Sequence, residues 1–260
     1  MKFRHRCGPN KLTRKRLREW YSNRLGKTLQ AVEREQLDEI LSDMFGYFLV
    51  QVGYPHNDNL FASSRVATRF IIDIDDGEKD ALSMRATAEE LPIATDSIDV
   101  LLLPHTMEFV DDPHQVLREA DRVLIPEGHI VILGFNPWGL WGLWRQILCR
   151  LGHPPWCGRF YRVTRLKDWL SLLGFETTEV RKFFHRPPVK SDGLLRKLGF
   201  MEKLGRIFWP WFSGVYILVA KKRVTTLIPT RSKLLRPDQL LPRRRAVEPS
   251  TRILRNDKHS

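Results

Sequence analysis

The sequence of 260 residues has few cysteines and no long apolar segment. Three cysteines in a chain of this length argue against a disulfide framework and favour a reducing compartment. No apolar run reaches the roughly 18 residues that a membrane span needs. The first residues, MKFRHRCGPN, lack the apolar stretch of a secretory signal. These absences exclude a small disulfide-stapled domain and a membrane-spanning protein, and we expect a cytoplasmic chain with one substantial core.

The sequence also lacks a GxGxxG motif, the glycine-rich turn with which many nicotinamide enzymes hold their dinucleotide. A nicotinamide-dependent oxidoreductase is therefore a poor interpretation. Acidic residues are scarce at both ends: residues 1–27 contain ten Lys or Arg and one acidic residue, and residues 221–260 contain twelve and three. We expect these basic ends to contact RNA or an anionic membrane surface, or to act only as solubilising segments.

Charge is also unevenly distributed over residues 28–220, the part of the chain between the two basic ends. Residues 28–127 carry seven basic and twenty-one acidic residues, whereas residues 128–220 carry fourteen and five. An acidic first half suits a cationic ligand, and a basic second half suits an anionic or polar-headed partner. For any single charge, a solvated position on the surface is the simpler interpretation.

Two apolar segments with a helical segment between them define the predicted core. Residues 98–103 and 129–135 are short runs rich in branched side chains, which is typical of strands buried on both faces. Between them, Asp111, Asp112 and Pro113 predict the start of a helix whose apolar residues recur at helical spacing. Two strands joined by one helix form a parallel pair with a right-handed crossover. The pattern therefore predicts an α/β fold.

Short motifs follow one another in a fixed order across this core. They are Leu91–Pro92, Ile98–Asp99, Met107–Glu108, Asp112–Pro113 and the run RVLIPEG that ends at Gly128. In this order and spacing the segment resembles the class I S-adenosylmethionine-dependent methyltransferases, in particular those of the ubiquinone and sterol type (methyltransferase type 11). The resemblance covers about residues 20–223. It implies a Rossmann-like three-layer sandwich with a seven-stranded, mostly parallel sheet whose last strand is antiparallel, and S-adenosylmethionine as the cofactor.

The remaining elements are placed from apolar periodicity and from turn residues. Helices are expected at residues 17–21 and 25–41, the second lying over the cofactor cleft, and at residues 164–175, where Thr164 is the predicted cap. In the second helix, Glu33 is predicted to lie largely off the apolar stripe. Further strands are expected at residues 45–52, 69–74, 83–88, 176–184 and 214–220.

These elements divide the chain into three parts. Residues 1–44 form a basic segment with the first helices, and residues 45–223 form the methyltransferase domain. Within that domain, residues 138–212 are expected to supply aromatic and basic elements on the substrate side. Residues 224–260, rich in proline and arginine, are expected to form a disordered tail.

The resemblance places cofactor contacts at the ends of the first three strands. The candidates are Gln51, Gly53, Asp73, Thr87 and Ala88. Asp73 is expected to accept hydrogen bonds from the ribose hydroxyls, with Asp75 as the second choice. Thr87 and Ala88 are expected to contact the adenine.

The glycine-rich loop of the family is degenerate in this chain. Gln51 stands where the family pattern has a carboxylate, and after Gly53 come Tyr54 and Pro55 instead of further glycines. Two interpretations stay open: the loop takes another route and still binds the cofactor, or cofactor affinity is weakened or lost.

His105 follows the fourth predicted strand, above the expected cleft. A neutral imidazole there would accept a proton from the nucleophile during methyl transfer, so His105 is the candidate catalytic residue. A purely structural role is the competing interpretation. Glu108 matches a glutamate of the family pattern, and its simpler role is capping or pairing at the start of the next helix.

Seven of the eight tryptophans lie between Trp138 and Trp211. Trp138, Trp141 and Trp144 would form one aromatic stripe on a helix, which suits a pocket for an apolar or aromatic substrate, a membrane interface or simple core packing. Cys149, His153 and Cys157 have no obvious fourth ligand, so no metal site is predicted.

We therefore interpret the sequence as a methyltransferase that uses S-adenosylmethionine and acts on an unidentified, apolar or aromatic small molecule. The alternative is a catalytically inactive protein with the same fold, which serves as a binding or scaffold module and uses its basic ends for RNA or membrane.

Overall fold

The computed structural model describes residues 11–53, 60–73, 83–148, 155–186 and 212–223. The chain divides into two units, Met1–Val224 and Thr225–Ser260. The second unit lies outside the described residues, so the disordered tail expected at residues 224–260 stays a prediction.

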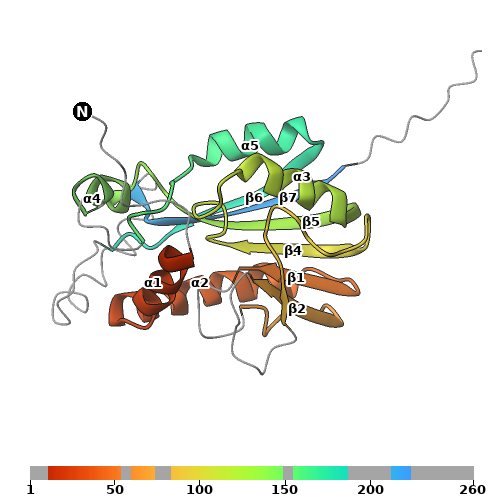
Figure 1. Cartoon of the computed structure of the whole chain (residues 1–260), viewed down its shortest axis with the longest axis horizontal. Helices are drawn as coiled ribbons and strands as arrows, with labels where there is room; N and C mark the ends of the chain where they lie inside the picture. Colours follow the sequence, from red (N-terminus) through yellow and green to blue (C-terminus); the bar gives the residue numbers. More distant parts are fainter. Residues whose placement is uncertain (1–10, 54–59, 74–82, 149–154, 187–211, 224–260) are drawn as a thin grey trace, which may run out of the picture. The chain divides into compact units, whose positions relative to one another are not determined.

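A single mixed sheet of seven strands forms the centre of the first unit (Figure 1). Its strands run in the order β3-β2-β1-β4-β5-β7-β6. Strands β1 to β5 pair in parallel, whereas β7 pairs antiparallel with both β5 and β6. The strands are β1 Phe48–Val52, β2 Thr68–Asp73, β3 Ser83–Arg85, β4 Ile98–Pro104, β5 Leu124–Phe135, β6 Phe175–Phe183 and β7 Val215–Lys222. The predicted sheet, mostly parallel with an antiparallel last strand, is confirmed.

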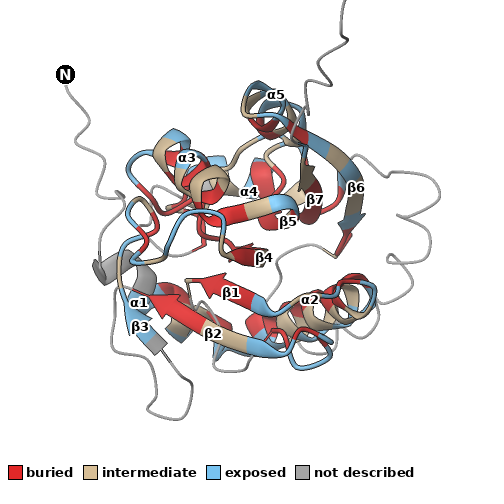
Figure 2. Cartoon of the chain, turned by 90° about the vertical axis from the view of Figure 1, so that its right-hand side faces the viewer, coloured by how far each residue is buried: buried red, intermediate tan, exposed pale blue. Residues whose placement is uncertain are grey.

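Helices cover both faces of this sheet, which gives the three layers. Successive residues of a strand point to opposite faces, and β4 shows the consequence. Val100 and Leu102 join a core that contains α1 and α2, whereas Leu101 and Leu103 join a core that contains α3 and α5. The helices are α1 Lys11–Tyr21, α2 Arg24–Ser42, α3 Pro113–Val123, α4 Leu140–Leu148 and α5 Val163–Leu172. In Figure 2 the central strands β1 and β4 are largely buried between these layers.

Several motif residues shape the backbone around β4. The Asp99 carboxylate accepts hydrogen bonds from the backbone N–H of Tyr47 (2.9 Å) and of Phe48 (2.8 Å), so it fixes the start of β1. The Asp112 carboxylate caps α3 by accepting from the N–H of His114 and of Gln115, as predicted. Each of these side chains satisfies backbone donors that would otherwise lack a partner.

Two local predictions are wrong. The strand expected at residues 129–135 begins earlier, at Leu124, and residues 126–128 lie within it as an irregularity opposite Asp99, because the pairing with β4 shifts between Ile98 and Val100. The predicted cap Thr164 lies inside α5: the N-cap is Arg162, in extended conformation and without a side-chain cap bond. Gly174, with a φ of 85°, ends the helix region as expected for a glycine after a helix.

Candidate functional site

The sequence-predicted site residues lie at one edge of the sheet, the edge where the parallel strands end. Gln51 and Gly53 are at the end of β1, Asp73 ends β2, and His105 follows β4. Thr87 and Ala88 follow β3, whose Arg85 pairs with Asp73. Ligands of open α/β sheets bind outside these carboxyl ends, so the fold brings the candidates to the edge where a cofactor is expected.

Gly53 occupies a position that only glycine tolerates well. Its φ is 90°, and a Cβ atom would lie 2.9 Å from the Thr106 hydroxyl oxygen. The Thr106 hydroxyl in turn donates to the carbonyl oxygen of Val52, which locks the end of β1 against the end of β4. The Gly53 N–H donates to the carbonyl oxygen of Ile72, so what this glycine contributes is the absence of a side chain beside the end of β4. Tyr54 and Pro55 lie outside the described residues, so the course of the loop stays a prediction.

Gln51 is fully buried next to this glycine. Its amide nitrogen donates to the carbonyl oxygen of Gly53 at 3.0 Å. Within the described parts of the chain, its amide oxygen has no hydrogen-bond partner. A buried acceptor without a partner costs free energy unless a ligand or water supplies a donor.

Asp73 is buried at the end of β2 and forms an ion pair with Arg18 of α1. The Arg18 side chain is about one fifth exposed and the Asp73 side chain almost not at all. No pattern in the sequence indicates this contact, because it joins residues 55 positions apart. Asp75, the second choice for the ribose, lies outside the described residues.

Thr87 and Ala88 differ in exposure. Thr87 is exposed and forms an isolated bridge with Glu90, whereas Ala88 is buried. The backbone leading to them is held to β2, since the N–H of Ala86 donates to the carbonyl oxygen of Asp73. Their expected contact with adenine stays a prediction.

His105 is buried between two carboxylates. Its Nε2 lies 2.9 Å from Oε1 of Glu33 in α2, and its Nδ1 lies 3.5 Å from Oε1 of Glu108. The hydroxyl of Tyr21, in α1, lies 3.4 Å from the same Glu33 oxygen. The His105 ring stacks on Phe135 at 4.1 Å. We call Tyr21, Glu33, His105 and Glu108 the histidine cluster.

The cluster changes the expected charge of the imidazole. Burial alone would lower the pKa of His105. The charge of Glu33 and the hydrogen bonds with Glu108 and Glu33 outweigh this effect and raise the pKa from its ordinary value of 6.5 to about 9. The ring is therefore protonated at neutral pH, whereas the sequence interpretation assumed a neutral one. Its catalytic role stays a prediction. Burial, with the charge of Glu33, also raises the pKa of Tyr21.

Sequence reasoning misplaced two members of the cluster. Glu33 was expected largely off the apolar stripe of α2, but it is fully buried. Its position four residues from both Leu29 and Leu37, which are buried too, was the signal for the core-facing side of the helix. Glu108 does not cap α3; its Oε1 accepts from the N–H of Phe135 at 2.7 Å and so links the ends of β4 and β5.

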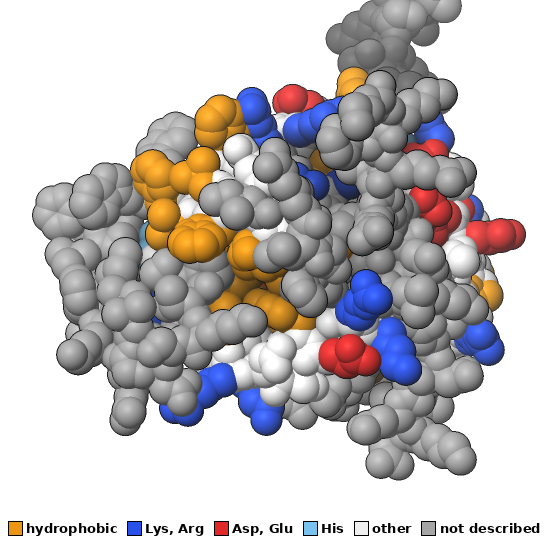
Figure 3. Space-filling model, turned by 60° about the vertical axis from the view of Figure 1, so that its left-hand side comes forward, with side chains coloured by type: hydrophobic (Ala, Val, Ile, Leu, Met, Phe, Trp, Pro, Cys, Tyr) orange, Lys and Arg blue, Asp and Glu red, His pale blue; other side chains and the backbone are white. Residues whose placement is uncertain are grey.

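The predicted tryptophan stripe does not form. Trp138 precedes α4 and is 60% exposed, Trp144 is 40% exposed, and Trp141 is fully buried. Of these three tryptophans, the core-packing interpretation holds for Trp141 alone, whose ring stacks on Phe135. The face that includes α4 carries a group of hydrophobic side chains with Lys and Arg nearby (Figure 3).

Only one of the three residues Cys149, His153 and Cys157 lies in the described part of the chain. Cys149 and His153 lie outside it, and Cys157 is disulfide-bonded, which the low cysteine count did not predict. Within the described ranges, no helix combines the length and apolar character needed to cross a membrane.

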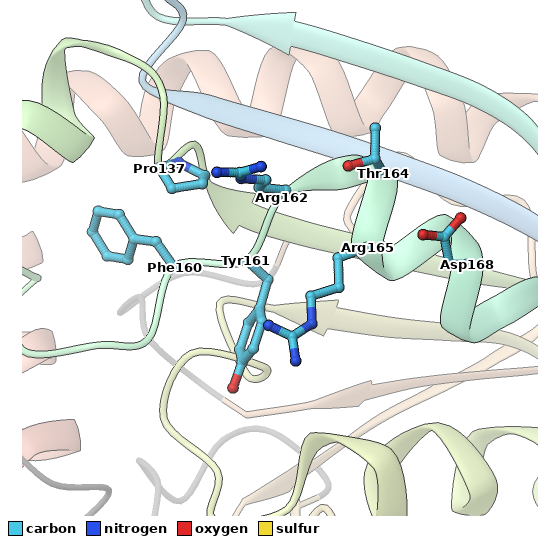
Figure 4. Close-up of a pocket in the computed structure, with 7 residues that line it drawn as sticks. All are labelled: Pro137, Phe160, Tyr161, Arg162, Thr164, Arg165 and Asp168. Carbon is cyan, nitrogen blue, oxygen red and sulfur yellow. The ribbon is translucent and has the colours of Figure 1, made fainter.

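A pocket of about 360 Å³ opens beside the end of β5 (Figure 4). One wall contains Phe160, which stacks on Phe135 at 5.0 Å, and Phe135 in turn stacks on His105. A chain of three rings therefore joins the pocket to the histidine cluster. The lining residues are Pro137, Phe160, Tyr161, Arg162, Thr164, Arg165 and Asp168.

The segment that carries this wall is tied to the sheet edge. The N–H of Arg159 donates to the carbonyl oxygen of Glu108. The Arg145 side chain of α4 donates to the carbonyl oxygens of Trp156 (3.2 Å) and Gly158 (2.9 Å) and lies over the Phe160 ring. These bonds fix the segment across the end of β4.

Comparison with known proteins agrees with this geometry. Residues 65–132 match the family described as "Methyltransferase domain". The uncharacterized protein YafS of Escherichia coli K12 is 32% identical over 232 residues, which cover 88% of this chain and 90% of that protein.

Solved structures share the fold. A SAM-dependent methyltransferase of Thermotoga maritima, described as a possible histamine N-methyltransferase, superposes with a TM-score of 0.54 at 18% identity, over 74% of this chain and 87% of that one. A putative methyltransferase solved in complex with the Haloferax volcanii Trm112 methyltransferase activator superposes with a TM-score of 0.54 at 14% identity. The match covers 79% of this chain and 97% of that one. At these identities the likeness concerns the fold. With the matched family, the strand order and the relationship to YafS, the chain belongs to the class I S-adenosylmethionine-dependent methyltransferases.

Proposed function

We propose that this protein transfers a methyl group from S-adenosylmethionine to a small-molecule acceptor at the carboxyl edge of its sheet. The observation that carries the proposal is the position of Asp73. A buried carboxylate at the end of β2, which Arg18 contacts through Oδ2, is placed to accept hydrogen bonds from the ribose hydroxyls of a nucleoside. Membership of the methyltransferase family supports the choice of cofactor.

The residues around Asp73 fit this cofactor. Gly53 places no side chain at the end of β1, because it has no Cβ, and its φ of 90° favours glycine there. The free amide oxygen of Gln51 is an acceptor for the ammonium group of the methionine part. Thr87 and Ala88 are the proposed neighbours of the adenine. We propose that the degenerate loop still binds the cofactor. Gln51 would then offer a hydrogen bond in place of the charged carboxylate of the family pattern.

The cofactor supplies an electrophilic methyl group on a sulfonium ion, and the chain's residues align the acceptor with it. In the proposed mechanism the histidine cluster stiffens the ends of β4 and β5, where the acceptor lies. His105, as an imidazolium between Glu33 and Glu108, serves this positioning role at neutral pH. An apolar or aromatic acceptor is favoured by the rings beside the cluster, Phe135 and Phe160.

Isothermal titration of S-adenosylmethionine and S-adenosylhomocysteine into the full chain tests the proposal. Micromolar binding, on the order of 8 kcal/mol, is expected for the wild type. Asp73→Asn should weaken it at least tenfold, because the ribose loses a charged acceptor. Asp43→Asn, at an exposed position after α2, is the matched control and should bind as the wild type does.

The same titration separates the enzyme from its alternative. A folded wild-type protein that binds neither ligand at millimolar concentration would contradict the enzyme and favour the inactive scaffold. In that case the basic ends, which lie largely outside the described residues, become the proposed contact with RNA or membrane.

A further inference from the structure

Two arginines at the pocket beside β5 lack an acidic partner within the described part of the chain. Arg162 and Arg165 form no ion pair or hydrogen bond through their guanidinium groups there. Other arginines behave differently: Arg122 pairs with Glu119, and Arg181 pairs with Glu39 and Glu179. The two pocket arginines therefore retain the capacity to bind an anion.

Indole rings hold these two guanidinium groups. The Cζ atom of Arg162 lies 4.3 Å from the ring centre of Trp138, and that of Arg165 lies 4.9 Å from that of Trp169. Stacking occupies a face of each guanidinium group but leaves its N–H groups, which lie in the plane, available to a ligand. It also restricts the long side chains before any ligand binds, which reduces the entropy that binding would cost.

The rest of the pocket combines an apolar wall with one acidic group. Phe160, Tyr161 and Pro137 provide flat apolar surface, and Thr164 adds a hydroxyl. Asp168 is the one carboxylate among the seven lining residues, against two arginines. The lining thus has an excess of one positive charge, which favours a ligand with a single acidic group over a cation.

The position of the pocket connects it to the proposed reaction. Pro137 follows β5 by two residues, and the arginines lie at the start of α5, so the pocket shares the carboxyl edge with Gly53 and Asp73. Figure 4 shows the lining side chains arriving from these two segments. Phe160 of the pocket wall stacks on Phe135, which is buried and stacks in turn on His105.

We propose that this pocket binds the acidic group of the methyl acceptor, so that the acceptor is a small acid with a flat apolar body. Arg162 and Arg165 bind its carboxylate or phosphate, and Phe160 and Tyr161 contact the apolar body. A volume of about 360 Å³ is at the small end for ligand sites and suits one ring with its acidic substituent. This inference names the acceptor of the proposed methyl transfer and rests on that function.

Phenyl phosphate, which combines one ring with an acidic group, is the probe for a calorimetric titration of the full chain. Benzyl alcohol, which has the ring but no charge, is the matched neutral probe. Phenyl phosphate should bind, and Arg162→Gln and Arg165→Gln should each weaken its binding about tenfold, because charge-assisted hydrogen bonds are lost. Arg165→Lys should retain part of the affinity, since it keeps the charge.

Arg118→Gln is the control variant. Arg118 is exposed on α3, and its guanidinium group contacts Gln115 rather than the pocket. It should bind phenyl phosphate as the wild type does. Equal binding by the wild type and both pocket variants, or equal binding of the neutral probe, would overturn the proposal.

S-adenosylhomocysteine binding, measured on the same samples, separates this inference from the proposed function. Both pocket variants should bind it with wild-type affinity, because neither arginine is among the proposed cofactor residues. A wild type that binds S-adenosylhomocysteine but not phenyl phosphate contradicts the acceptor pocket alone. A wild type that binds phenyl phosphate but not the cofactor contradicts the methyl transfer, and with it the pocket's role as an acceptor site.

Discussion

Arg18 of α1 donates a hydrogen bond to the carboxylate of Asp73 at the end of β2. The contact ties the first helix of the described chain to the sheet edge that is proposed to hold the cofactor. Arg18 bonds one oxygen of that carboxylate, Oδ2, and so draws on the same negative charge that the ribose hydroxyls would use. Cofactor binding and the position of α1 are therefore expected to depend on each other.

Arg18→Gln should strengthen the binding of S-adenosylhomocysteine about fivefold. Without the guanidinium group, the ribose no longer competes with Arg18 for the Asp73 carboxylate, and a partly exposed ion pair contributes about 1 kcal/mol or less. Calorimetric titration measures the change. Arg16→Gln, an exposed residue of the same helix, should leave the affinity unchanged. Weaker binding by Arg18→Gln would instead make Arg18 part of the cofactor site.

Gly53→Ala should abolish cofactor binding. The matched variant Gly174→Ala separates this effect from the backbone strain that alanine causes at any positive φ. Both Gly53 (φ 90°) and Gly174 (φ 85°) adopt the left-handed region, where alanine costs on the order of 1 kcal/mol. Only at Gly53 would the added Cβ lie under 3 Å from a neighbour, the Thr106 hydroxyl. Urea unfolding should show both variants destabilised, and titration should show binding lost in Gly53→Ala alone. Loss of binding in Gly174→Ala too would point to a general loss of stability.

The sequence predicted the fold well because its motif residues act locally. Asp112 caps α3 and alternating apolar residues form β4, and both features follow from neighbours in the chain. The site was predicted less well because its charges meet across the fold. The pairs Arg18 with Asp73 and Glu33 with His105 join residues 55 and 72 positions apart, and no spacing rule connects them.

The start of α5 shows a different limit. The pattern beginning at Thr164 has the form of a threonine cap, yet the helix begins at Val163 after Arg162. Arg162 stacks on Trp138, which lies between β5 and α4, and the sequence does not show this tertiary contact. Local sequence preference defines the start of a helix only to within a residue or two, so a tertiary contact such as Arg162 on Trp138 can decide where α5 begins.

The histidine cluster should make stability depend on pH between 6.5 and 9. The pKa of His105 is about 9 in the folded protein, against an ordinary value of 6.5. Because the folded state binds this proton more tightly, the stabilisation is fully present below pH 6.5 and is lost as the pH rises through 9. The difference corresponds to a loss on the order of 3 kcal/mol in the free energy of unfolding.

Urea unfolding at several pH values across this window measures the slope. His105→Gln should be less stable at pH 6.5 and should show a much flatter dependence above it. Burial raises the pKa of Tyr21 above its ordinary value of 10, so its hydroxyl does not titrate there. An unchanged slope in His105→Gln would show that another group carries the dependence.

Arg122→Lys should lower the free energy of unfolding by about 2 kcal/mol, because one ammonium group cannot replace a guanidinium group that bonds two backbone carbonyl oxygens and a carboxylate. Arg122 donates to the carbonyl oxygens of Leu91 (2.9 Å) and Ile93 (2.8 Å) and to the carboxylate of Glu119 (2.8 Å). Urea unfolding measures the loss, and Arg118→Lys on the same helix, with its one long contact to Gln115, should change little. Since Arg122 holds the segment directly after the proposed adenine contact Ala88, S-adenosylhomocysteine should also bind more weakly to Arg122→Lys. A variant that loses stability but keeps full affinity would place that segment outside the cofactor site.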